Sequence, residues 1–416
     1  MAFPNPAIAK ALVKAAGAYG TPCYLTDLAE LDRTAGEMRS AFPDPWLRQY
    51  SLKANPLPAI VARLADGGLG ANVVSVGEWE SARRAQLPNH CITFEGIGKT
   101  DAELQLAVGA AAAGDPLRWL TLESTDEAFS LRELAKQANL DRDRRPLDVL
   151  LRLNPAVAPE THSGFRVGAK SSKFGMAVAE LKGLVASILE DDQGLRVRGV
   201  HVHVGSQLNA TTAWASAAVK ASRLVRELSR LDDLIDTVDI GGGFPSGEES
   251  TRSPADFREQ LDAAMAKGKV SLPARAAVEP GRYLVASAGW LIAKVLHVRH
   301  RNGAAQIVID ASFAELIRPA LYGARHAVLP LTSSVATSPH ESVQTLVEGA
   351  VCESTDSFGL HLLPPLVRGD LVVLENTGAY AASMFSHYNG RPQPPEVFLQ
   401  PDGGLSLARA GQPFSP

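Results

Sequence analysis

The stretch "RQYSLKANP", residues 48–56, distinguishes between two possible fold classes, a (β/α)8 barrel and an open doubly wound sheet. Its first residues resemble a short buried strand, and Asn55 and Pro56 stand where a helix is expected to begin. A dinucleotide-binding sheet carries a Gly-x-Gly-x-x-Gly turn after its first strand, and no such turn follows here. The strand ends instead at Lys53, so a segment that looks buried carries an ammonium group, which requires an explanation.

Seven more strand-like segments follow, separated by amphipathic stretches rich in Ala, Leu and Glu. The eight expected strands are 47–55, 70–76, 91–96, 118–124, 148–155, 196–206, 236–243 and 274–281. The expected helices include 101–113, 126–139, 178–192, 212–232 and 255–268. This alternation predicts an α/β fold, a (β/α)8 TIM barrel at residues 27–280, rather than an open doubly wound sheet with extra strands.

After residue 283 the sequence becomes β-rich and shows no long helical period. We expect residues 281–416, together with residues 1–26, to form a second, mostly antiparallel domain, a β-sandwich or β-barrel. The segment "TPCYLTD", residues 21–27, is expected to add a strand to that domain before the chain enters the barrel.

Composition excludes several classes of protein. The chain has 416 residues, 41 basic and 45 acidic, and a net charge of −4, which is no basis for binding nucleic acid. Its three cysteines are scattered, which argues against a disulfide framework or a zinc knuckle. No apolar run reaches the ~20 residues of a membrane span, and no signal pattern opens the chain. We therefore expect a soluble, cytoplasmic protein.

Functional groups of a barrel gather where its strands end, and "GVHVHVGSQ" places two histidines there. Side chains alternate along a strand, so His201 and His203 are expected to share the face that points into the barrel. Three interpretations stay open: histidines satisfied within the core, ligands of a metal, or an aromatic surface against a flat cofactor. A metal would need further ligands, and no histidine ends the other expected strands.

Two other strand ends favour a phosphate-bearing cofactor. Gly241, Gly242 and Gly243 follow the seventh expected strand and expose backbone N–H groups, as phosphate binding requires. Glu279 ends the eighth strand, where a buried carboxylate needs a positive or proton-donating partner, such as a pyridinium nitrogen. Together with Lys53, these groups form the set that pyridoxal phosphate requires.

Seven motifs between residues 50 and 392 carry a resemblance to a known family. They are "YSLKAN", "HVHVGSQL", "DIGGGF", "EPGRYLVASAG", "RPALYGA", "CESTD" and "TGAY…FSHYNGRP". With them the chain resembles the pyridoxal-phosphate decarboxylases of the alanine-racemase-like fold, the ornithine/diaminopimelate decarboxylase family. Its branch that acts on diaminopimelate is the nearest. The resemblance implies a lyase with pyridoxal 5'-phosphate as cofactor, no metal, and an amino acid as substrate.

The resemblance also implies roles for single residues. Lys53 carries the cofactor covalently, which avoids the cost of a buried ammonium group, and Cys352 is the general acid. The other implied cofactor-binding residues are His203, Ser206, Gly241, Gly242, Gly243, Glu279, Gly281, Arg282 and Tyr380. The implied substrate-binding residues are Arg282, Arg318, Tyr322, Glu353 and Tyr380. In the family, Cys352 and Glu353 enter the site of the partner subunit, so a two-fold homodimer is implied.

The implied reaction is the decarboxylation of meso-diaminopimelate to L-lysine and CO2. Decarboxylation of another amino acid or conjugate stays open, including one tethered to an acyl-carrier protein, because four positions depart from the family pattern: Val76, Trp79, Val167 and Asn376. A non-catalytic cofactor-binding protein is disfavoured because Lys53, Glu279 and Cys352 are all present. A racemase is disfavoured by "CESTD" and the motifs of the second domain.

Overall fold

The computed structural model describes residues 5–157, 168, 172–190, 194–247, 250, 252–301, 304–332 and 342–415. The chain divides into two compact units. The barrel unit contains Thr34–Pro245 and Glu249–Gly281, and the sheet unit contains Met1–Arg33, Ser246–Glu248 and Arg282–Pro416. Among the described residues, we find no helix with the length and apolar character that crossing a membrane requires.

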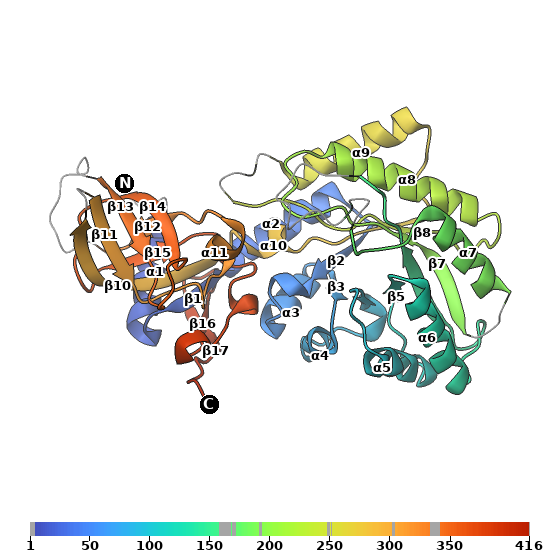
Figure 1. Cartoon of the computed structure of the whole chain (residues 1–416), viewed down its shortest axis with the longest axis horizontal. Coiled ribbons are helices and arrows are strands. Elements are labelled where there is room, and N and C mark those ends of the chain that lie inside the picture. Colours follow the sequence, from blue (N-terminus) through green and yellow to red (C-terminus); the bar gives the residue numbers. More distant parts are fainter. Residues whose placement is uncertain are drawn as a thin grey trace. The chain divides into compact units, whose positions relative to one another are not determined.

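The barrel unit is a closed barrel of eight parallel strands surrounded by helices (Figure 1). In order, the strands are β2 (Leu47–Ser51), β3 (Gly70–Val73), β4 (Ile92–Phe94), β5 (Trp119–Leu122), β6 (Leu147–Arg152), β7 (Leu195–His201), β8 (Thr237–Asp239) and β9 (Arg275–Val278). The barrel closes where β9 pairs with β2, with Leu47 opposite Ala277. The predicted TIM barrel is therefore confirmed, and each of the eight expected segments overlaps one of these strands.

The helices follow strands, and four of them begin after a residue whose side chain caps the first turn: Ser75, Thr100, Ser124 and Ser253. They are α2 (Leu28–Ala41), α3 (Pro58–Asp66), α4 (Val76–Arg84), α5 (Asp101–Ala112), α6 (Thr125–Gln137), α7 (Val178–Leu189), α8 (Thr212–Leu228) and α9 (Pro254–Gly268). Before α5, Thr100 and Glu103 form a capping box, and Ser253 and Asp256 form another before α9. Each box satisfies backbone N–H groups that the first helical turn leaves unpaired, so the helix starts at a defined residue.

The sheet unit is built on a nine-stranded sheet in which most neighbouring strands are antiparallel. Its strands are β1 (Cys23–Asp27), β10 (Gly289–Arg301), β11 (Ala304–Ile309), β12 (Val328–Pro330), β13 (Val343–Glu348), β14 (Ser357–Leu363), β15 (Leu371–Leu374), β16 (Glu396–Leu399) and β17 (Leu405–Arg409). As predicted from "TPCYLTD", β1 belongs to this sheet, between β10 and β16.

Three helices of the sheet unit were not predicted from the sequence: α1 (Pro6–Tyr19), α10 (Arg282–Val285) and α11 (Arg318–Tyr322). The first is a regular helix that starts at Asn5, whose side chain accepts from the N–H groups of Ala7 and Ile8. Its buried residues Ala11, Leu12 and Ala15 belong to the apolar cluster that includes β1. The other two are single turns, too short to show a helical period.

Candidate active site

Polar side chains gather where the barrel strands end. Asp239 and His201 are the last residues of β8 and β7, and Glu95 and Glu279 directly follow β4 and β9. Lys53 lies two residues beyond the end of β2. In barrels of this kind the carboxyl ends of the strands carry the active site, so these residues define the candidate site.

Lys53 is positioned by a short 3-10 turn, η1 (Leu52–Ala54). The end of β2 is held to the end of β9 because the N–H of Ser51 donates to Pro280 O at 3.0 Å. Leu52 and Ala54 are buried, whereas the side chain of Lys53 is exposed. The expectation of a buried lysine was therefore wrong, because the turn directs its flanking residues inward and the lysine outward. An exposed amine can react without first escaping an apolar environment.

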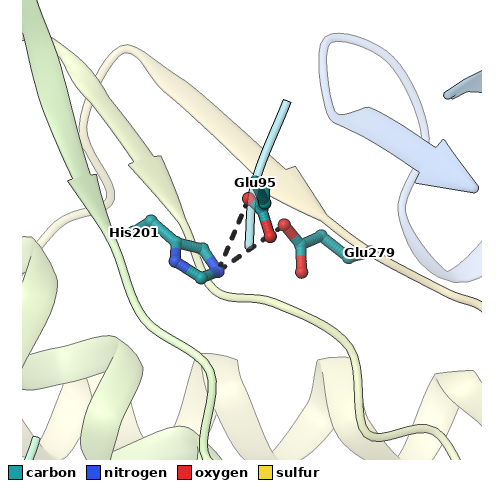
Figure 2. A group of neighbouring side chains, drawn as sticks. All are labelled: Glu95, His201 and Glu279. Carbon is teal, nitrogen blue, oxygen red and sulfur yellow. Dashed lines mark ion pairs between the residues drawn. The ribbon is translucent and has the colours of Figure 1, made fainter. Parts of the chain in front are cut away.

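His201, Glu95 and Glu279, which we call the barrel floor, point toward one another (Figure 2). His201 Nε2 lies 3.5 Å from Glu279 Oε1 and 3.7 Å from Glu95 Oε1. All three side chains are buried, with at most 5% of any residue exposed. Glu279 Oε1 and both ring nitrogens of His201 have no hydrogen-bond partner among the described residues. These buried polar atoms are therefore unsatisfied among the described residues, which costs free energy of folding.

Two carboxyl groups this close cannot both be ionised at low cost. One candidate ligand atom from each residue of the floor lies within 4.8 Å of the others. At that distance, two unit charges repel by roughly 3.5 kcal/mol at an effective dielectric constant of ~20. Burial and then the Glu95 carboxylate raise the pKa of Glu279 well above its usual value. The pKa of Glu95 is instead held well below its usual range. Burial raises this pKa, but it is outweighed by the interaction with His201, by a hydrogen bond with Glu279 and by the charge of Arg152.

His203 lies beyond the end of β7, outside the strand that was expected to hold it. Its ring is half-buried, and its Nδ1 accepts a hydrogen bond from the N–H of Gly242 at 3.1 Å. Burial and then the charge of Lys53 lower its pKa well below the usual value. The two histidines therefore separate: His201 belongs to the barrel floor, and His203 stands beside the glycine loop as a neutral aromatic ring.

Gly241, Gly242 and Gly243 form a loop in which side chains have no room. A Cβ on Gly241 would lie 2.6 Å from His203 Nδ1, and one on Gly242 would lie 2.3 Å from Glu279 O. Gly241 and Gly243 also have positive φ angles of 70° and 108°. The loop thus brings bare backbone next to His203 and Glu279, in the arrangement that a phosphate cradle requires. Ser206 lies in the loop after β7 and is half-buried.

These observations test whether a pyridoxal cofactor suits the barrel. A primary amine, a flat neutral imidazole, a glycine loop and a buried carboxyl with an unpartnered oxygen are the groups that such a cofactor needs. All of them belong to the barrel unit. The residues present therefore fit the cofactor.

The sheet unit contains a second polar cluster, formed by the predicted residues Arg282, Arg318, Tyr322 and Tyr380. The guanidinium carbon of Arg282 lies 4.7 Å from the centre of the Tyr380 ring. Arg282 and Arg318 are 6% and 7% exposed. Burial and then Arg282 lower the pKa of Arg318 to about 9. Two buried cations that repel each other would be stabilised by an anion.

Arg318 is held by a histidine that the sequence did not indicate. Its Nη1 donates to His326 Nε2 at 2.8 Å, because a guanidinium can only donate. The other ring nitrogen, Nδ1, must then carry the proton and donate to Glu375 O, also at 2.8 Å. Burial and then Arg318 lower the pKa of His326 to about 4, so the ring stays neutral and keeps its acceptor.

Cys352 and Glu353 lie on the exposed connection between β13 and β14. Tyr388 donates its hydroxyl to Glu353 Oε1 at 2.5 Å. The connection is anchored by Asp356, whose oxygens accept from the N–H groups of Phe313 and Val351 at 2.7 and 2.9 Å. Both residues are thus presented on a surface of the sheet unit.

The four departures from the family pattern have different outcomes. Trp79 is buried, packs near Phe94 and donates its ring N–H to Asn89 Oδ1 at 2.9 Å, so it has a structural role. Val76 is the first residue of α4. Asn376 has a φ angle of 58°, a conformation that asparagine adopts more readily than most residues. Val167 lies outside the described residues.

Gly281 is the last residue of the barrel unit, and a Cβ there would lie 3.1 Å from the Cβ of Ser51. Besides His326, the sequence did not indicate Glu95, Asp239 or the buried ion pair of Arg152 with Glu123. Glu95 and Glu123 each directly follow a short buried strand, and this position was a signal that could have found them.

The fold and the barrel site together define a barrel enzyme suited to a pyridoxal cofactor. Residues 28–286 match the family model described as "Pyridoxal-dependent decarboxylase, pyridoxal binding domain". The chain belongs to the pyridoxal-dependent decarboxylases, so it is a carboxy-lyase that uses pyridoxal phosphate and acts on an amino acid. The expectations of family, reaction class and cofactor are thereby confirmed.

Relatives with assigned names agree with this membership. The chain is 32% identical to the diaminopimelate decarboxylase of Zymomonas mobilis, over 93% of this chain and 90% of the relative. It is 33% identical to that of Deinococcus radiodurans, over 93% of this chain and 92% of the relative. Among solved structures, diaminopimelate decarboxylase from Helicobacter pylori, complexed with L-lysine, matches with a TM-score of 0.87 and 29% identity over 97% of both chains.

Proposed function

We propose that the protein converts meso-diaminopimelate to L-lysine and CO2. The observation that carries the proposal is the buried pair Arg282 and Arg318, whose charges favour an anion. A substrate with a second carboxylate supplies that anion, and a guanidinium binds it through two parallel hydrogen bonds. Tyr322 adds a hydroxyl donor, and Glu353 accepts the distal ammonium group. The names of the relatives support the same substrate.

The cofactor, when bound, supplies an electron sink for the negative charge that develops on the α-carbon as CO2 leaves. Lys53 holds the cofactor covalently through its amine. His203 would lie against the ring, and Glu279 would face the ring nitrogen. Ser206, the three glycines and Tyr380 would hold the phosphate, and Gly281 and Arg282 are the other residues that we assign to the cofactor. Cys352 donates a proton from its Sγ to the α-carbon after CO2 has left.

Release of CO2 from a panel of amino acids tests this assignment. The panel contains the diaminopimelate stereoisomers, lysine, ornithine and arginine. We expect turnover of the meso isomer and very slow turnover of lysine and ornithine, which carry no second acid to balance the charges of the two guanidinium groups. A site built to bind a polar group can reject a substrate that lacks this group by up to ~10⁴-fold. Efficient release of CO2 from ornithine would contradict the proposal.

We also propose that the enzyme is a homodimer in which Cys352 and Glu353 serve the partner's cofactor. Their exposure on the β13–β14 connection supports this arrangement. Mixing inactive Lys53→Ala protein with inactive Cys352→Ala protein is then expected to restore activity. Random exchange makes half of the dimers mixed, and each mixed dimer has one intact site of two, so recovery reaches about a quarter of wild-type activity.

The mixing experiment needs proof that subunits exchange. Differently tagged variants, purified in series, isolate the mixed dimer directly, and this species is expected to have about half of the wild-type activity. A pure mixed dimer without activity would mean that each site takes Lys53 and Cys352 from one chain.

A further inference from the structure

Glu95 has no part in the function proposed above, yet it lies in the barrel floor beside Glu279 (Figure 2). It is 5% exposed, and Thr121, which is fully buried on β5, donates its hydroxyl to Glu95 Oε1 at 3.1 Å. Burying one carboxyl group is costly, and burying a second one next to it is more so. The pair therefore needs a feature that lowers this cost.

The charges around the floor do not neutralise two carboxylates. Asp239, on β8, adds a third buried acid, and burial and then Glu279 raise its pKa well above the usual value. Arg152, on β6, forms an ion pair with the buried Glu123. Lys53 is exposed on its turn, and burial lowers the pKa of His201. Lys53 and Arg152 lower the pKa of Glu279, but burial and the Glu95 carboxylate outweigh them, so one of the two carboxyl groups holds a proton.

The hydrogen bonds indicate which group is ionised. Thr121 donates to Glu95, whereas Glu279 Oε1 has no donor among the described residues. A carboxylate is stabilised by each donor that it accepts from, and a carboxylic acid can itself donate. Glu95 is therefore the anion of the pair, and Glu279 is the acid.

We propose that Glu95 and Glu279 share one proton, and that the fixed negative charge of Glu95 keeps this proton on Glu279. Glu95 acts through Glu279 and is a positioning residue for that proton. What this shared proton does for the cofactor rests on the proposed function, in which Glu279 faces the ring nitrogen. That nitrogen then meets a proton donor already present in a buried site, and no water is needed to deliver it.

Infrared spectroscopy of the full-length protein, freed of its cofactor, tests the shared proton. Glutamate labelled at its carboxyl carbon shifts the glutamate bands away from those of aspartate. At neutral pH, the wild-type spectrum is expected to contain the C=O band of a protonated glutamic acid. This band should be lost in Glu279→Gln and also in Glu95→Gln, where Glu279 ionises once its charged neighbour is removed. It should persist in Glu95→Asp, which keeps the charge, and in Asp239→Asn, the control for the other buried acid.

Two results would overturn the proposal: loss of a carboxylate band alone in Glu279→Gln, or an unchanged acid band in Glu95→Gln. Circular dichroism checks that each variant folds, and Glu95→Ser is a second uncharged variant should Glu95→Gln not fold. The spectra involve neither cofactor nor substrate. A failed decarboxylation assay therefore leaves this inference intact, and a failed infrared test leaves the substrate proposal intact.

Discussion

Lys53→Ala is expected to abolish decarboxylation and to remove the visible absorption of the bound cofactor. The amine of Lys53 is exposed on the η1 turn, where it can form the covalent link, and alanine offers no nucleophile in its place. We expect turnover to fall by ~10³-fold or more, which corresponds to a rise of about 4 kcal/mol in the barrier. Absorption spectra and CO2 release, measured on the same preparation, check both parts.

Lys182→Ala is the matched control, because Lys182 lies on α7 and pairs with Glu227 near the surface. It should keep the band and full activity. Lys99 is another lysine of the barrel unit, but its ammonium group is buried, pairs with Glu127 at 2.8 Å and donates to Gly96 O and Thr121 O. If the Lys53→Ala protein still showed the visible band, the cofactor would be attached to a different lysine and our assignment would fail.

Arg318→Ala is expected to have the second-largest effect on activity, and mainly on activity toward the dicarboxylic substrate. It removes one of two buried guanidinium groups, and losing one partner of a buried, hydrogen-bonded charge pair costs about 2–5 kcal/mol. The kcat/KM for meso-diaminopimelate should therefore fall by roughly 30- to 4,000-fold. Most of this loss is expected in KM, because the group binds an end of the substrate that does not react.

A second substitution separates the effect of the charge of Arg318 from that of its planar geometry. Arg318→Lys keeps a cation but cannot form two parallel hydrogen bonds, so we expect an intermediate loss. Arg325→Ala is the control, because Arg325 is exposed and should leave KM unchanged. Cofactor content, measured from the visible band, should stay near the wild-type level in all three. An Arg318→Ala enzyme with an unchanged KM would show that this arginine does not select a distal acid.

Much of the barrel could be predicted from the sequence because its signals are local. Each strand is a short apolar segment, and each helix repeats its apolar positions along a few turns. The helix expected at residues 255–268 is found at Pro254–Gly268, and the strand expected at 70–76 contains Gly70–Val73. The sheet unit was predicted less completely. β14, β16 and β17 belong to a sheet whose pairing joins distant segments, as where β1 pairs with β16.

The features of the candidate site also fall into two groups, those that could be predicted from the sequence and those that could not. Lys53, His203, the glycine loop and Glu279 could be named because a parallel barrel brings the ends of its strands together, whatever the distances along the chain. Their surroundings depend on tertiary contacts. The exposure of Lys53 follows from the η1 turn, and the raised pKa of Glu279 follows from its burial and from Glu95, which the closed barrel places beside it. Side-chain periodicity is a property of about ten neighbouring residues, whereas burial and charge balance arise only when the whole barrel closes.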